Sequence, residues 1–296
     1  MAGFLRKFVL TLEMIKFEHS IFALPFALTG ALLAMREDAY ATPALGWKLL
    51  WIVVAMVAAR SAAMAFNRVA DAQIDARNPR TQSRHLPAGT LSTTFAWAFV
   101  VAASVLFTIA AGALNPLCLK LAPVALAVVL SYSFTKRFTS FSHVVLGFAL
   151  GIAPSAAWIA IRGSLEPRIL WLTAAVTFWT AGFDIIYSCQ DYEFDKREGL
   201  FSIPSRLGIS GALWVARFFH IAMLLCLIML VSSFDLGAAG WAGIAAVGLL
   251  LAWEHRLVRA DDLSRIDAAF FTLNGWISVL FLVFIAADLF LLRNRT

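Results

Sequence analysis

Two separated clusters of acidic residues are the part of this sequence with the clearest potential for chemistry. In the first cluster, Asn67, Asp71 and Asp75 follow one another at intervals of four residues. If this segment is helical, the three side chains drift by only about 80° around the axis and form one row of oxygen atoms. Such oxygen atoms are the ligands that Mg²⁺ accepts while it also binds phosphate oxygens. The first cluster therefore predicts a magnesium-dependent phosphate site.

The second cluster repeats this pattern more than a hundred residues later. Asp184, Tyr187, Asp191 and Asp195 share a helical face, whereas Glu193 should point elsewhere. Two such rows in one bundle would repel each other unless divalent cations lay between them. We therefore expect a cation-bridged diphosphate as the occupant. The simpler alternative is that these carboxylates only pair with neighbouring Arg and Lys at a membrane surface.

Basic residues lie beside both clusters and could complement a phosphate group. Arg60 falls on nearly the same helical face as Asn67 but two turns deeper, where a cation suits an anionic group of a substrate. The other basic residues of this kind lie in the connecting loops, and they are Arg80, Arg84, Lys136 and Arg137. Each of these also fits the interpretation that loop cations only mark the cytoplasmic side of a membrane.

Long apolar segments must position these residues. Of the 296 residues, 61% are hydrophobic and 14% are charged, a composition that a soluble globule cannot bury. Residues 4–17 have the pattern of an interfacial helix. The sequence predicts an all-α integral membrane protein with nine spans, at about residues 20–35, 46–66, 93–113, 117–135, 143–161, 169–187, 212–233, 237–254 and 269–290.

The distribution of Lys and Arg predicts how the chain lies in the membrane. Most loop cations fall on the same side as the N-terminus, which favours a cytoplasmic N-terminus in the cell inner membrane. Both acidic clusters then lie at the cytoplasmic ends of spans. Gly147 and Gly151 form a GxxxG pattern that predicts close helix packing.

Several other functions lose support from the sequence. The basic residues, although the net charge is +6, do not gather on one solvated face, so we expect no nucleic-acid partner. The five histidines lack zinc-site spacing, and neither a Walker A loop nor GxGxxG occurs. Asp261 and Asp262 resemble the start of a DDxxD motif, but residue 265 is Arg, so we assign them to a loop. The three cysteines are expected to be packing residues.

The first cluster resembles the first signature of the UbiA superfamily of intramembrane prenyltransferases. The matching residues are Asn67, Asp71, Asp75, Asn78, Pro79, Arg80, Thr81 and Arg84. One position departs from the commoner pattern, because Arg68 stands where a second acidic residue is usual. The resemblance therefore leaves Asn67, Asp71 and Asp75 as the set facing magnesium.

The second cluster resembles the second signature of the same superfamily, and a basic motif lies between the two. The matching residues are Asp184, Tyr187, Gln190, Asp191 and Asp195 for the signature, and Tyr132, Lys136 and Arg137 for the basic motif. The order of the motifs and the nine spans extend the resemblance over the whole chain. It implies a UbiA-type nine-helix bundle that forms a single transmembrane domain over residues 1–296.

This resemblance also implies an activity and a set of roles. The expected reaction transfers a polyprenyl chain from an allylic diphosphate to the ring of 4-hydroxybenzoate or 1,4-dihydroxy-6-naphthoate, in ubiquinone or menaquinone biosynthesis. Mg²⁺ would be held by Asn67, Asp71, Asp75, Asp191 and Asp195. Substrates would be bound by Arg60, Arg80, Arg84, Lys136, Arg137, Asp184 and Gln190.

The reaction itself assigns further roles. Tyr132 and Tyr187 would cover the allylic cation, and Asp191 would accept the ring proton. The apolar tail is expected among aromatic-rich helices, in a cavity open to membrane lipid. Two alternatives are a secondary transporter with intramembrane acidic ion sites and an enzyme of lipid-headgroup transfer. The second alternative lacks its expected Asp-Gly start, because the chain has no such dipeptide.

Overall fold

The structure is a computed structural model that describes residues 9–15, 22–37 and 44–292. Within these residues the chain is helical between its loops and contains no β-sheet, only an isolated bridge between Arg259 and Asp262. The all-α prediction is confirmed. The long helices are α2 (Leu24–Glu37), α3 (Leu45–Arg77), α4 (Thr93–Leu114), α5 (Pro116–Thr135), α6 (Ser142–Arg162), α7 (Leu170–Ser188), α9 (Ile203–Ser233), α10 (Ala238–Leu257) and α11 (Asn274–Ala287).

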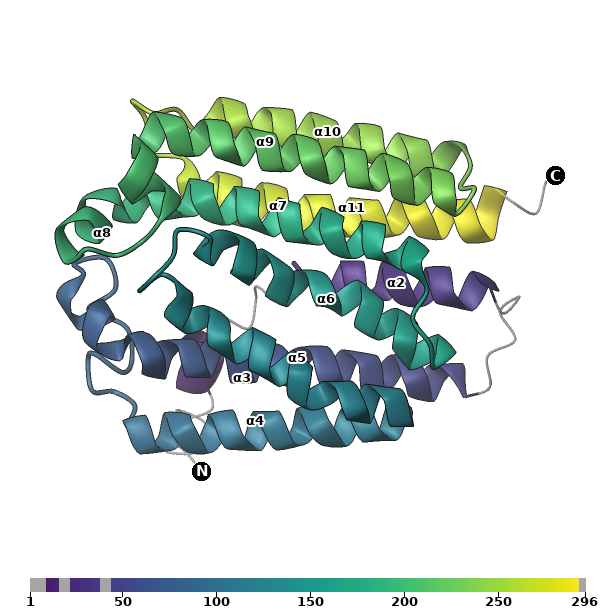
Figure 1. Cartoon of the computed structure of the whole chain (residues 1–296), viewed down its shortest axis with the longest axis horizontal. Coiled ribbons are helices and arrows are strands. Elements are labelled where there is room, and N and C mark those ends of the chain that lie inside the picture. The colour runs from purple at the N-terminus through teal and green to yellow at the C-terminus, as the bar shows by residue number, and fades with distance from the viewer. Residues whose placement is uncertain (1–8, 16–21, 38–43, 293–296) are drawn as a thin grey trace.

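These helices lie side by side as a bundle of roughly parallel rods (Figure 1). Each packs on its neighbours in chain order, from α3 against α4 to α10 against α11, and α2 packs against α6 and α11. The main core forms around α2, where Phe26, Ala27 and Leu33 are fully buried. Burying apolar residues of α2 between two distant parts of the sequence joins the bundle into one body.

Seven helical segments in the described part of the chain are long and apolar enough to cross a membrane. The chain is therefore a multi-pass membrane protein. The expected count of nine is not confirmed, because α2, with 14 described residues, and α10 do not belong to that set. The first two residues of the first predicted span, 20 and 21, lie outside the described residues. Of the predicted interfacial segment 4–17, residues 9–14 are helical and most of the others lie outside the described residues.

The predicted span limits agree with the helices to within a few residues, except where a helix continues beyond the apolar segment. Helix α3 runs on to Arg77 and so carries the whole first cluster. At about 1.5 Å per residue its 33 residues extend about 50 Å, well beyond a hydrocarbon core of about 30 Å. Helix α9 begins nine residues before the predicted start at 212, with a kink at Gly208.

The second cluster lies on the end of a long helix and two short helical segments that follow it, instead of on one continuous helix. Asp184 and Tyr187 belong to α7, Asp191 ends the 3-10 helix η3 (Cys189–Asp191), and Asp195 lies in α8 (Tyr192–Glu198). Helix α8 ends at Gly199, whose φ of 68° is readily adopted by glycine. This turn and the loop after α3 lie at the same end of the bundle, on the left in Figure 1.

Helices α6 and α7 approach closely at the predicted GxxxG pattern. A Cβ atom on Gly147 would lie 2.3 Å from the carbonyl oxygen of Thr177, and one on Gly151 would lie 2.2 Å from the Thr177 hydroxyl. No real side chain tolerates such distances, so the contact requires glycine at both positions. The prediction of close packing is confirmed.

Candidate active site

Both acidic clusters face one polar cavity of about 290 Å³ at the end of the bundle that carries α8. Asp71 and Asp75 reach it from α3, and Asp184, Asp191 and Asp195 reach it from the segment that begins with α7. The two rows therefore share a compartment, as their spacing predicted. The other predicted site residues that line this cavity are Asn67, Arg60, Arg80, Arg84, Tyr132, Lys136 and Tyr187.

Asp71 is buried and is surrounded by donors from two helices. Its carboxylate accepts a hydrogen bond from the amide of Asn67 at 2.9 Å. The Lys136 ammonium and the Arg137 guanidinium, at the end of α5, each lie 3.3 Å from one of its oxygens. A buried carboxylate needs such partners to remain charged. Arg137 does not itself line the cavity, so its contact with the site passes through Asp71.

Asp75 is held by the loop that follows α3. The Arg84 guanidinium donates to both of its carboxylate oxygens, at 2.7 and 2.8 Å. The Thr81 hydroxyl donates to the Asp75 carbonyl at 3.1 Å and fixes the start of this loop. The loop therefore folds back over the end of α3 and brings a cation to the cavity.

Asp191 joins the two clusters. Arg80 donates to both of its oxygens, one of them at 2.9 Å, and the Asn78 amide donates to it at 2.9 Å. Arg80 also donates to the Tyr187 hydroxyl at 3.3 Å. Burial lowers the pKa of Arg80, but the hydrogen bond and charge of Asp191 outweigh it and hold this pKa above its ordinary value. Arg80 is therefore a permanent cation between the two clusters.

The remaining acidic residues have different surroundings. Asp184 contacts Nδ1 of His143 at 2.7 Å, and Nε2 of His143 accepts the backbone N–H of Ile203 at 3.2 Å. Asp195 is buried at the cavity, whereas Glu193 is exposed and does not line it, as the helical-face argument expects. Gln190, which was expected to bind substrate, does not line the cavity either.

Several residues at the cavity were given no role from the sequence, among them Asn78, His143 and Arg68. Asn78 donates to Asp191, and its place in the first signature was the available signal. His143 contacts Asp184, but only the packing of α6 on α7 brings them together. Arg68 is buried and donates to the carbonyl of Met14 at 3.3 Å. The arginine at this position, where an acidic residue is usual, therefore links the N-terminal helical residues to the site.

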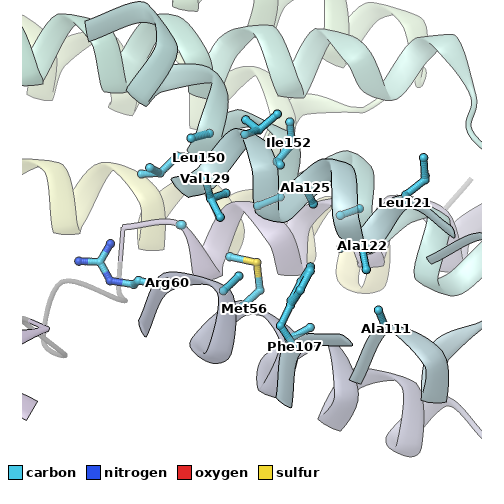
Figure 2. A pocket seen from close by; sticks show the side chains of 18 of the residues that line it. Met56, Arg60, Phe107, Ala111, Leu121, Ala122, Ala125, Val129, Leu150 and Ile152 are labelled. Carbon is cyan, nitrogen blue, oxygen red and sulfur yellow. The ribbon is translucent and has the colours of Figure 1, made fainter. Parts of the chain in front are cut away.

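A second, apolar cavity of about 330 Å³, shown in Figure 2, shares lining residues with the polar one. Its lining is mainly alanine, leucine and valine from α3, α4, α5 and α6, with only Phe107, Tyr132 and Phe148 as aromatic residues. The space in this cavity thus comes from small aliphatic side chains, and the location of the prenyl tail among aromatic-rich helices stays a prediction. The residues that line both cavities are Arg60, Met64, Tyr132, Leu146 and Leu150.

The donor set at the polar cavity suits a magnesium ion that arrives with a phosphate ligand. Among the residues described, no three Asp, Glu, His or Cys side chains gather closely enough to hold a metal by themselves. Mg²⁺ is usually bound by one or two carboxylates together with waters and substrate phosphates. The oxygen ligands of the cavity fit that mode. The pairing of the carboxylates with cations also agrees with the alternative that they only form ion pairs with neighbouring Arg and Lys at a membrane surface. These pairs, however, line a shared cavity.

Comparisons with known proteins were consistent with one another. A family model described as "UbiA prenyltransferase family" matches residues 23–285. The 4-hydroxybenzoate octaprenyltransferase of Thiobacillus denitrificans is 32% identical over 231 residues, which are 78% of this chain and 78% of that protein. The apo structure of a UbiA homologue from Aeropyrum pernix K1 is similar with a TM-score of 0.82 and 35% identity, over 92% of this chain and 98% of that chain.

A more distant structure shares the fold. It is a UbiA homologue from Archaeoglobus fulgidus bound to DMAPP and Mg²⁺, with a TM-score of 0.72 and 19% identity, over 95% of this chain and 99% of that chain.

Proposed function

Because this chain belongs to the UbiA prenyltransferase family, we propose that it transfers a polyprenyl chain from an allylic diphosphate to a ring carbon of 4-hydroxybenzoate and releases pyrophosphate. The observation that carries this proposal is that the polar cavity adjoins the apolar one, with residues that line both. An amphiphile with a charged head and a long apolar tail fits such a pair. The acceptor is suggested by the relatives named 4-hydroxybenzoate octaprenyltransferase, and 1,4-dihydroxy-6-naphthoate is the acceptor to compare.

In this proposal the diphosphate lies in the polar cavity and competes with carboxylates for their cations. Arg80, Arg84 and Lys136 line the cavity and already face negative oxygens. Phosphate oxygens can replace some of these contacts, because guanidinium groups bind phosphate as readily as carboxylate. Arg137 and Gln190 do not line the cavity, and we assign them to support of their neighbours.

Mg²⁺ would be held by Asp71, Asp75, Asp191 and Asp195 with Asn67, and when bound it would neutralise the charge that develops on the pyrophosphate leaving group. A UbiA homologue from Archaeoglobus fulgidus has been solved bound to Mg²⁺ together with DMAPP and, separately, together with GPP, which supports this choice of ion.

The apolar tail would lie in the cavity shown in Figure 2. Leu121, Val124 and Phe148 line this cavity, and each is more than a third exposed. The cavity is therefore bordered by side chains that face lipid, and a membrane-dissolved tail can reach it without passing through water. Arg60, where the two cavities join, is the proposed partner of the acceptor carboxylate.

The chain's own residues would then stabilise the two charges that form in the reaction, the negative charge on pyrophosphate and the positive charge on the allylic carbon. Fixed cations around the diphosphate favour departure of pyrophosphate with the electron pair of the breaking C–O bond. The aromatic faces of Tyr132 and Tyr187 would stabilise the allylic cation. The ring carbon donates its electrons to the allylic carbon, and Asp191 would accept the ring proton. Asp184, oriented by His143, would bind a polar group of the acceptor.

We also propose that the polar cavity faces the cytoplasm in the cell inner membrane. The loop cations that favour this orientation include Arg80, Arg84, Lys136 and Arg137, and all of them lie at the cavity end of the bundle. Both expected water-soluble partners, the aromatic acid and Mg²⁺, would then come from the cytoplasm.

The function is tested with the purified protein in lipid vesicles. Labelled farnesyl and octaprenyl diphosphates are supplied with Mg²⁺ and either 4-hydroxybenzoate or 1,4-dihydroxy-6-naphthoate. We expect label on 4-hydroxybenzoate, one pyrophosphate per product, and loss of both on chelation of Mg²⁺. Label on the naphthoate alone would correct the acceptor, and label on neither acceptor would contradict the proposed reaction.

A further inference from the structure

A buried network of polar side chains lies outside the polar cavity and connects three helices. Trp179 in α7 donates its indole N–H to the side-chain oxygen of Asn274 at 2.7 Å. The Asn274 amide nitrogen donates to Oε1 of Glu254, in α10, at 3.0 Å. All three side chains are fully buried. Polar groups in such surroundings are costly when they lose a partner, so the network fixes the positions of its helices relative to one another.

Asn274 also holds an unusual piece of helix. It follows directly after the π-helix η4 (Ala268–Leu273), and its amide nitrogen donates to the carbonyl of Ala269, five residues earlier, at 3.2 Å. A π-helix has wider turns than an α-helix, is rare, and occurs frequently at functional sites. The network therefore anchors the C-terminal end of η4.

The π-helix places one aromatic residue at the polar cavity. Phe270 lines this cavity, and its ring lies 4.1 Å from the ring of Tyr187, centroid to centroid. It also packs edge-on against Phe183 at 5.2 Å and Phe22 at 5.8 Å. Tyr187 in turn accepts a hydrogen bond from Arg80. A continuous set of contacts thus runs from the network to the residues around the proposed diphosphate.

We propose that Asn274, held by Trp179 and Glu254, is a positioning residue that sets Phe270 against Tyr187 and thereby keeps water away from the allylic carbon in the polar cavity. This inference rests on the proposed function. After the C–O bond of the allylic diphosphate breaks, the ring carbon supplies the electron pair for the new C–C bond and then loses its proton. If water reaches the same allylic carbon, it forms a C–O bond, loses a proton, and yields a prenyl alcohol.

The ratio of prenyl alcohol to prenylated acid therefore measures how well the packed rings of Phe270 and Tyr187 exclude water. The protein in lipid vesicles is supplied with labelled prenyl diphosphate, Mg²⁺ and acceptor, and both products are counted against pyrophosphate released. We expect Phe270→Leu to raise the ratio by between about twofold and tenfold, the range that loss of the ring contact with Tyr187 alone represents. Phe219→Leu is the matched control, because Phe219 stacks on Phe178 in the bundle and does not line the polar cavity.

The network is tested by replacements that keep or remove its hydrogen bonds. Glu254→Gln retains the oxygen that accepts from Asn274, so its ratio should equal that of the unchanged protein. Glu254→Leu and Asn274→Leu remove the bond and should raise the ratio as Phe270→Leu does. Gel filtration in detergent shows which variants are folded, and Phe270→Leu and Glu254→Gln test the inference even if the two others are not.

Three results would overturn the inference. An unchanged ratio in Phe270→Leu would show that this ring does not exclude water. An equal loss of both products in Asn274→Leu would show that the network only stabilises the fold. A Glu254→Gln variant as altered as Glu254→Leu would show that the carboxyl group acts through its charge or its proton. If the unchanged protein formed no prenylated acid, the proposed function would fail instead, which is a separate outcome.

Discussion

At the polar cavity, each of three carboxylates contacts a cation that another segment supplies. Asp71 contacts Lys136, Asp75 contacts Arg84, and Asp191 contacts Arg80. Removing one member of such a pair leaves the other charge uncompensated, which in buried pairs costs about 3–5 kcal/mol. Activity measurements on these residues therefore require replacements of similar shape and a check that the variant is folded.

Replacing Asp71 or Asp191 by Asn should reduce prenyl transfer by about 100-fold or more, because each is proposed to hold Mg²⁺ and to stabilise charge in the transition state. Glu193→Gln should change the rate by less than about twofold, since that side chain is exposed and lies away from the cavity. The rates of labelled product formation in lipid vesicles, per folded protein, check this. Near-normal transfer by Asp191→Asn, or a large loss in Glu193→Gln, would contradict the metal assignment.

Arg60→Met should weaken binding of the aromatic acid and spare the prenyl diphosphate. A hydrogen bond to a charged group contributes about 1.5–3 kcal/mol, so the KM for the acceptor should rise by about 10- to 100-fold. Arg60→Lys should restore part of this affinity because it keeps the charge but not the planar pair of donors. KM values for both substrates are measured separately. A rise confined to the prenyl diphosphate would assign Arg60 to that substrate instead.

At the residue scale the spacing of the acidic clusters was sufficient to predict that both face one cavity. Helical periodicity determines which side chains of one segment share a face, and Asp71 and Asp75 follow it. The partners of these side chains could not be predicted, because they depend on tertiary packing. Arg80 and Asp191 are 111 residues apart, and His143 meets Asp184 only where α6 crosses α7.

At the scale of elements, hydropathy located the helices well but not their local irregularities. The apolar segments set the limits of α4, α5 and α6 to within about one residue, since hydrocarbon requires a continuous helix. The 3-10 helix η3 and the π-helix η4 were not predicted, because their residues are as compatible with an α-helix. What selects η4 includes the contacts of Asn274, which come from α7 and α10.

Replacing glycine by alanine should change the stability of the protein in opposite directions at two positions. Gly147 lies in the close contact of α6 and α7, and Gly112 lies in α4. Gly147→Ala would place a methyl group 2.3 Å from a backbone oxygen of α7, and overpacking of this kind costs about 1–3 kcal/mol. Gly112→Ala meets only side-chain atoms of Leu119 at 3.7 Å or more, so it should gain up to about 1 kcal/mol of helix stability.

Thermal unfolding in detergent compares these two variants directly. The melting temperature should fall for Gly147→Ala, by about 2–4 °C for each kcal/mol lost, and should be unchanged or higher for Gly112→Ala. A fall of equal size in both variants would show that glycine is needed at these positions for a reason other than the distance between α6 and α7.

For the whole molecule, the apolar cavity gives a prediction about the length of the prenyl chain. Ala125 lines this cavity, whereas Ala127, in the same helix, is exposed on the outside. Ala125→Phe should fill part of the cavity and lower kcat/KM for octaprenyl diphosphate by about tenfold or more relative to geranyl diphosphate, since buried methylene groups contribute about 0.8 kcal/mol each. Ala127→Phe should leave the preference unchanged. Equal effects of the two variants on both substrates would place the tail elsewhere.

In the proposed reaction, the junction of the two cavities at Arg60, Met64 and Tyr132 would also determine where the products go. Pyrophosphate would leave the polar cavity into water, while the tail of the alkylated ring would stay in the apolar cavity and then enter lipid. The two products would enter different phases and be diluted away from each other, so they would seldom return together. This separation would help to make the synthesis run in one direction.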